Sequence, residues 1–195
     1  MKKTLLFLIV FLFGSLAINA QWNTMFVGLN GTLSLPLGDF SDIASTGYGV
    51  SGNFYYSISE NFDVIGSLGF ISWNRDAGQL SESVSAEASG TKLTIPILVG
   101  GRYYFEGDNL KPFGAAKFGF HIFNSSDYKV TVNNVVLLDE KGETNVNFGF
   151  SLGGGAIYEI TKTFNFEGAL MYNVISGDNS LAHLTIDLGF KVAID

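Results

Sequence analysis

The C-terminal stretch AHLTIDLGFKVAID, residues 182–195, alternates apolar side chains with polar, charged or small ones. The apolar residues fall at every second position from Ala182 to Ile194. Successive side chains of a β-strand point to opposite faces, so this period predicts a strand with one apolar and one polar face. The same pattern recurs along the chain, which therefore belongs to the all-β class.

Eight segments follow this pattern, and no segment shows a helical period. Most of them exceed the roughly 5–6 residues usual in soluble sheets and reach the roughly 9–11 that a tilted strand needs to cross a bilayer. The predicted strands are Thr24–Leu35, Tyr48–Ile58, Phe62–Asn74, Thr91–Phe105, Lys111–Phe123, Asn145–Ile160, Phe164–Val174 and Leu181–Ile194.

The connections between these strands alternate in length. Three are short and four are longer: 59–61, 107–110 and 161–163 against 36–47, 75–90, 124–144 and 175–180. Tight turns at one end and long loops at the other are typical of an antiparallel up-and-down barrel in an outer membrane, with periplasmic turns and extracellular loops. An even number of strands places both mature termini on the periplasmic side.

The two faces of the strands differ in a way that indicates which solvent each meets. In the strand over 145–160, Phe148, Phe150 and Leu152 share one face, while Asn147 and Ser151 share the other. A small closed barrel has room inside only for small or polar side chains and fixed water, so the large apolar face is predicted to meet lipid.

Aromatic residues gather at strand ends, as two interfacial belts require. One set flanks the short turns and a second flanks the long loops: Tyr56, Phe62, Tyr103, Phe105, Tyr158 and Phe164, then Tyr48, Phe70, Phe120, Phe148 and Tyr172. Two features fit less well. Pro96 falls inside a strand, where a bulge would accommodate it, and the third strand places Ile65, Ile71 and Trp73 on the nominal inner face.

Residues 1–20 read as a secretory signal peptide, with Lys2 and Lys3 ahead of a short apolar run and a small-residue cleavage site before Gln21. Residues 21–195 then form the mature barrel. Because the first twenty residues contain two lysines and no acid, the net charge of −7 becomes −9 after cleavage. This acidity disfavours nucleic acid as a partner, and the absence of cysteine excludes disulfides and thiolate metal sites.

The segment Leu93–Leu98 followed by Gly101–Phe105 resembles the corresponding strand of small OmpA/OmpX-like outer-membrane barrels, especially those of the Bacteroidetes type. The glycine-rich Gly149–Gly155 stretch is similar as well. The resemblance implies an eight-stranded outer-membrane barrel in contact with lipid and lipopolysaccharide. It also implies recognition by the barrel-assembly machinery through a C-terminal signal, assigned to Asp187, Gly189, Val192 and Ile194.

Charged residues of both signs share the predicted inner face. Charges withdrawn from water must pair or be hydrated, so we expect a structural network that fills the lumen, built from Arg102, Lys117, Glu167, Asp187 and Lys191, with Asp63 and Glu159 on the same face. The alternative is a narrow ion-conducting path. A wide pore is not expected from eight strands.

No catalytic, cofactor or metal site is predicted. His121 and His183 lack further ligands at a recognisable spacing. A lipid-modifying enzyme would need a nucleophile, a histidine and an acid facing lipid, whereas His183, Thr185 and Asp187 face inward. The G-x-S-x-G match at Gly149–Gly153 lies inside a strand and not at the elbow that this motif requires.

The longest connection, 124–144, contains two apolar β-like runs on either side of Asn133 and Asn134. A hairpin that projects beyond the membrane is expected, and its edge could pair with an extracellular protein. Acidic residues there, such as Asp139 and Glu140, also suit divalent cations that bridge to lipopolysaccharide. The sequence thus favours a monomeric barrel with a structural or surface-interaction role, such as adhesion or membrane integrity.

Overall fold

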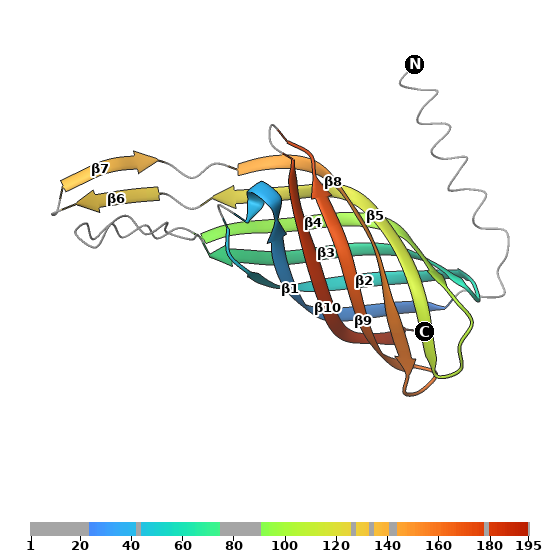
Figure 1. The fold of residues 1–195 in the computed structure, drawn as a ribbon. Helices are drawn as coiled ribbons and strands as arrows, with labels where there is room; N and C mark the ends of the chain where they lie inside the picture. The colour runs from blue at the N-terminus through green and yellow to red at the C-terminus, as the bar shows by residue number, and fades with distance from the viewer. Residues whose placement is uncertain are drawn as a thin grey trace, which may run out of the picture.

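The computed structural model describes residues 24–41, 44–74, 91–125, 128–132, 135–140, 144–177 and 180–194. Eight strands close a barrel in the order β1-β10-β9-β8-β5-β4-β3-β2, and two further strands form a separate two-stranded sheet (Figure 1). The barrel strands are β1 (Met25–Leu37), β2 (Gly47–Ser59), β3 (Phe62–Asn74), β4 (Thr91–Tyr104), β5 (Leu110–Ser125), β8 (Thr144–Glu159), β9 (Phe164–Ile175) and β10 (Leu181–Ile194).

Every neighbouring pair in the barrel is antiparallel, so the predicted up-and-down topology is confirmed. β1 closes the barrel against β10, with Met25 opposite Ile194 and Leu37 opposite Ala182. Each predicted strand end lies within two residues of the observed one. The signal peptide predicted for residues 1–20 lies outside the described residues.

The inside-out distribution of side chains is confirmed. Outward positions carry exposed large apolar side chains, such as Leu29 at 67 % exposure, Leu152 at 59 % and Phe118 at 54 %. Inward positions carry buried polar residues such as Asn30 and Thr185. Since a lipid-facing wall has no apolar protein layer covering it, this exposure is what a membrane-spanning barrel requires. In the described part of the chain, no helix is both long and apolar enough to span a bilayer.

Pro96 is accommodated without a bulge, so that expectation was wrong. Leu68 pairs with Ile97 and Ile71 with Thr94, and the register between β3 and β4 is the same on both sides of the intervening gap. Pro96 has no N–H to donate to a ladder, and an added Cβ at Gly69 would lie 3.0 Å from its Cγ. The missing side chain of Gly69 therefore makes the room that a bulge was expected to provide.

The two ends of the barrel differ in how they are covered. At the loop end, the one-turn 3-10 helix η2 (Gly38–Phe40) follows β1 and brings the buried Phe40 inward. A hairpin of β6 (Tyr128–Val132) and β7 (Val135–Glu140) projects past the ends of β5 and β8 (Figure 1). This pairing confirms the predicted hairpin, while its turn at 133–134 lies outside the described residues. The turn end carries only short connections.

Candidate functional site

The turn-side half of the lumen contains a buried salt bridge between Arg102 on β4 and Glu167 on β9. Arg102 Nη1 lies 2.6 Å from Glu167 Oε2, and both side chains are almost fully buried. Tyr55 Oη and Asn30 Nδ2 donate hydrogen bonds to Glu167 Oε1 at 2.6 and 2.9 Å. Removing a charge from water is costly unless its remaining lone pairs are also satisfied, and here three donors converge on one carboxylate.

A second buried salt bridge joins Lys191 on β10 to Asp63 on β3, with 2.6 Å between Lys191 Nζ and Asp63 Oδ2. Tyr104 Oη donates to the same carboxylate oxygen at 2.7 Å and accepts hydrogen bonds from Lys191 at 2.9 Å and from Arg102 at 3.4 Å. Tyr104 therefore links the two salt bridges into one network that spans the barrel.

Aromatic rings close the space around these charges. The Arg102 guanidinium lies 3.8 Å from the centre of the Phe113 ring, and Lys191 Nζ lies 4.2 Å from that of Phe26. Phe113 also packs in an apolar cluster with Tyr104, Ala115, Ile157 and Met171. Cation–π contacts of this kind are favourable when the cation is desolvated. The turn-side half is thus filled by paired charges and rings.

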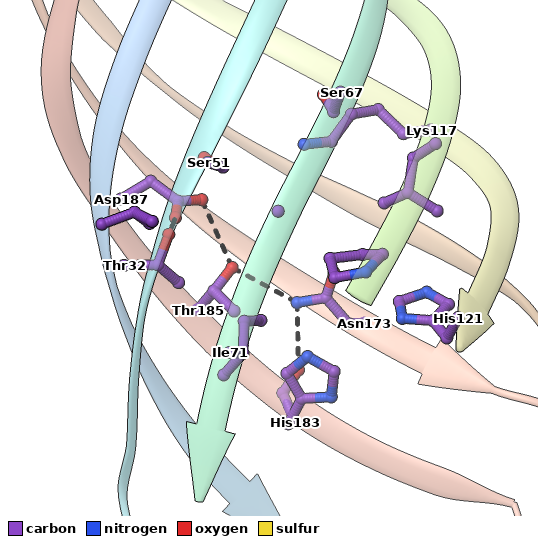
Figure 2. A pocket seen from close by; sticks show the side chains of 14 residues that line it. Thr32, Ser51, Ser67, Ile71, Lys117, His121, Asn173, His183, Thr185 and Asp187 are labelled. Atoms are coloured by element: carbon purple, nitrogen blue, oxygen red, sulfur yellow. Dashed lines mark hydrogen bonds between the residues drawn. The ribbon is translucent and has the colours of Figure 1, made fainter. Parts of the chain in front are cut away.

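The middle of the barrel is more open. A cavity of about 40 Å³ is lined by polar residues that include Lys117, His121, His183 and Asp187 (Figure 2). A second cavity of about 20 Å³ lies on the side of Arg102, and it shares Ser51, Lys117 and Asp187 with the first. Cavities of this size and polarity hold a few water molecules.

An apolar cluster closes the loop end above the first cavity. Phe40 packs edge-on against Trp73, with ring centres 5.3 Å apart, and Trp73 packs edge-on against His183 at 5.5 Å. Ala44 and Ile71 complete the buried part of the cluster. The inward orientation of Ile71 and Trp73, which the alternation predicted, is confirmed and places them here. The sequence did not predict the contribution of Phe40, because it lies in a connection and not in a strand.

The structure places the predicted lumen residues in two groups. Arg102, Glu167 and Lys191 belong to the turn-side network, whereas Lys117 and Asp187 line the cavities. Asp187 accepts hydrogen bonds from Thr32 at 2.5 Å and Thr185 at 3.4 Å. Glu159 alternates in phase with the buried Ile157 and so lies on the inner-face side of β8, but at the turn-end rim and not within the enclosed lumen: its side chain is 41 % exposed and pairs with Lys111 at 2.7 Å.

Sequence reasoning missed three polar members of the turn-side network: Asn30, Tyr55 and Tyr104. Each lies on the inner face of its strand, so the alternation of the sequence already placed these residues in the lumen.

The residues of the predicted assembly signal divide between the two faces. Asp187 lines the cavities and Gly189 is buried, whereas Val192 and Ile194 are exposed on the outer wall.

The geometry of the His183, Thr185 and Asp187 trio does not match that of a catalytic triad. Thr185 donates to Asp187, but His183 Nδ1 is buried without a partner, and all three residues face the lumen. A general base must lie within hydrogen-bond reach of its nucleophile. Among the described residues, no three histidines or carboxylates converge as a metal site would require.

Comparison with known proteins defines the class. Residues 5–192 match the outer membrane protein beta-barrel domain family, so the chain belongs to that family and is an integral barrel of the outer membrane. None of the curated protein sequences is similar enough to count as a match.

Several solved structures share the fold. The attachment invasion locus protein Ail of Yersinia pestis has a TM-score of 0.56 at 14% identity, covering 88% of this chain and 99% of Ail. OprG of Pseudomonas aeruginosa has a TM-score of 0.56 at 14% identity, covering 88% and 96%. Neisserial surface protein A has a TM-score of 0.53 at 13% identity, covering 86% and 96%. At such low identity, the likeness concerns the fold alone.

Proposed function

We propose that this protein is a closed surface barrel that binds an extracellular protein at its loop end. The observation that carries this proposal is the contrast between a blocked lumen and a projecting hairpin. Two buried salt bridges, each at 2.6 Å, fill the turn-side half, while β6 and β7 extend past the barrel at the opposite end (Figure 1). A barrel blocked in this way has its accessible features at its ends and not in a pore.

The hairpin offers a specific way to bind. β6 and β7 pair only with each other in the described part of the chain, so each keeps one edge of unpaired backbone N–H and C=O groups. An extended segment of a partner protein can add to such an edge as a further strand. The loop end is extracellular in this proposal, with both mature termini in the periplasm.

The structural relatives suggest a second ligand chemistry, which the charge of this chain opposes. Ail has been crystallised with the heparin analogue sucrose octasulfate, and the name of Ail refers to attachment and invasion. The net charge of −7 before cleavage disfavours a polysulfated ligand here. A protein strand is therefore the better candidate partner for this chain.

Replacing residues 128–140 by a Gly/Ser linker of equal length tests the proposal. Cells that display the intact protein should be retained on a surface coated with a panel of purified extracellular proteins and not on one coated with heparin, and the replacement should remove that retention. The matched control exchanges turn residues 107–109 for Gly/Ser and should leave retention unchanged. Equal retention with and without the hairpin would contradict the proposal.

A narrow conducting barrel is the second candidate, favoured by the two cavities that adjoin at Lys117. Conduction would require both turn-side salt bridges to separate. A role in membrane integrity is compatible with either candidate.

We further propose a monomer that contacts lipopolysaccharide and is inserted by the barrel-assembly machinery through Asp187, Gly189, Val192 and Ile194. Substituting Val192 and Ile194 with serine should then lower the amount in the outer membrane, whereas an unchanged amount would contradict the assignment.

A further inference from the structure

A short lid folds into the loop end of the barrel. It consists of residues 38–41 and Ala44, and its aromatic side chain, Phe40, is only 1 % exposed. Ser41 N–H donates to the Gly38 carbonyl at 2.9 Å, and Ala44 N–H donates to the Phe40 carbonyl at 3.1 Å. Because these backbone hydrogen bonds join lid residues to one another, the lid can move as a unit without breaking them.

Three rings in mutual contact hold the lid in place. Phe40 packs edge-on against Trp73, with 5.3 Å between ring centres, and against His183 at 6.3 Å. Trp73 packs edge-on against His183 at 5.5 Å. All three side chains are fully buried. Displacing Phe40 therefore admits water to both Trp73 and His183.

His183 lacks what it would need to carry a positive charge while the lid is closed. Its Nδ1 is buried without a partner, and its neighbours in the ladders are Pro36 on β1 and Asn173 on β9. No carboxylate in the described part of the chain forms an ion pair with it. Since an unpaired buried charge is costly, the closed lid favours the neutral imidazole.

His121 is in the same situation on the opposite wall. Both of its ring nitrogens are buried without a partner, and its neighbours in the ladders are Pro96 on β4 and Asn147 on β8. His121 and His183 line the same 40 Å³ cavity beneath the lid. Water that enters past a displaced Phe40 can therefore hydrate both imidazoles.

The charged groups of the cavity also disfavour an imidazolium. Lys117 precedes His121 by four residues on the inner face of β5 and lines the cavity with it. Asp187 lines the cavity too, but it accepts hydrogen bonds from Thr32 and Thr185, and the Lys117 amino group lies on its side, away from both histidines (Figure 2). The carboxylate is thus matched to Lys117 and not to a histidine.

Two further charged residues lie at the rim of the loop end. Lys92 is opposite Trp73 in the ladder between β3 and β4 and adds another positive group. Asp39 belongs to the lid and is exposed to solvent, where water screens its charge. Neither residue gives the histidines a buried counter-charge.

We propose that acid opens this lid through protonation of His121 and His183. An imidazole in contact with water takes up a proton near pH 6.5, whereas the enclosed rings resist the charge. The open state therefore binds more protons than the closed state. The ratio of open to closed molecules consequently rises as the pH falls below about 6.5, by up to about tenfold per pH unit for each histidine. Opening exposes aromatic rings at the loop end, while the turn-side salt bridges keep the lumen closed.

Trp73 reports the state of the lid, because its ring packs on both Phe40 and His183. The only other tryptophan is Trp22, so a Trp22→Phe background isolates its fluorescence. Full-length protein in detergent micelles is titrated with acrylamide, a neutral quencher, between about pH 7.5 and 4.5, above the usual range of carboxylates. The quenched fraction of the emission should rise reversibly on acidification, while far-ultraviolet circular dichroism shows intact strands.

Variants assign the response, because the chain contains only these two histidines. The logarithm of the open-to-closed ratio should rise by up to about two per pH unit in the parent protein. His121→Gln or His183→Gln should reduce this slope by about half, and the double variant should abolish it. The matched control Glu159→Gln removes an exposed titratable group at the turn end and should keep the parent slope. Phe40→Ala should be quenched at every pH.

Equal quenching at both ends of the pH range in the parent protein would overturn the proposal. An undiminished slope in the double histidine variant would overturn it as well, since another group would then drive the opening. If the double variant does not fold, an undiminished slope in both single variants leads to the same conclusion.

Discussion

The two halves of the lumen are built by the same strands and the same alternation, yet they treat charge differently. In the turn-side half, Arg102, Glu167, Lys191 and Asp63 are paired at 2.6 Å and enclosed by tyrosine hydroxyls and rings. In the loop-side half, Lys117 faces a cavity. Placing charges inside a barrel therefore does not by itself determine whether they block it. Blocking depends on polar neighbours at the same level, such as Tyr55 and Tyr104.

Glu167→Gln should have the largest effect on stability, because it leaves the Arg102 guanidinium buried without a counter-charge. Breaking a buried ion pair by removing one partner costs about 3–5 kcal/mol, and Tyr55 and Asn30 lose their acceptor charge as well. Urea-induced unfolding in micelles, followed by the loss of heat-modifiable gel mobility, measures the change. A loss below about 1 kcal/mol would mean that the turn-side half is hydrated like the loop-side half.

Lys191→Met should cost somewhat less, about 2–3 kcal/mol, because Asp63 keeps hydrogen bonds from Tyr104 and Ser57 after the ammonium group is gone. The same unfolding assay applies. A cost equal to that of Glu167→Gln would show that these hydroxyl donors do not compensate for the lost charge.

Glu159→Gln tests whether the effect depends on burial and not on ion pairing alone. The Lys111–Glu159 pair has a 2.7 Å separation, close to the 2.6 Å of the buried pairs, but its side chains are 36 % and 41 % exposed. Exposed pairs contribute about 0–1 kcal/mol. The unfolding free energy should therefore fall by less than about 1 kcal/mol. A loss as large as that of Lys191→Met would remove the distinction between enclosed and exposed charges.

Lys117→Met should change stability least, by no more than about 0.5 kcal/mol in either direction, since Lys117 forms no salt bridge with the residues that the structure describes and the cost of burying its charge is removed with it. Lys191→Met is its matched comparison, as both remove an inward lysine. A loss above about 2 kcal/mol would show that Lys117 has a partner within the lumen that fixes it as firmly as Asp63 fixes Lys191.

The fold was predictable because a lipid-facing barrel imposes a strict period of two on every strand. The inversion of apolar and polar faces identified the membrane barrel, and even Ile71 and Trp73, which fitted that inversion least well, lie inside as their positions predict. The inner charges were also visible in the sequence. Their partners were not, because pairing depends on strand register and on the tilt that brings Asp63 on β3 to Lys191 on β10.

Two features required coordinates. Phe40 lies in a connection, where alternation carries no information, so its position above Trp73 could not be foreseen. Pro96 was expected to need a bulge, but the absence of a side chain at Gly69 on the neighbouring strand provides the space. Both depend on contacts between segments whose spatial relation the sequence does not state.

Single-channel recording of the full mature barrel in a planar bilayer tests whether the turn-side salt bridges close the lumen. Closure by these salt bridges predicts no conductance steps for the wild type, and brief openings in Glu167→Gln, where Arg102 has lost its partner. Steady open steps in the wild type would contradict this closure, since ions would then pass two buried salt bridges that the structure shows to be formed.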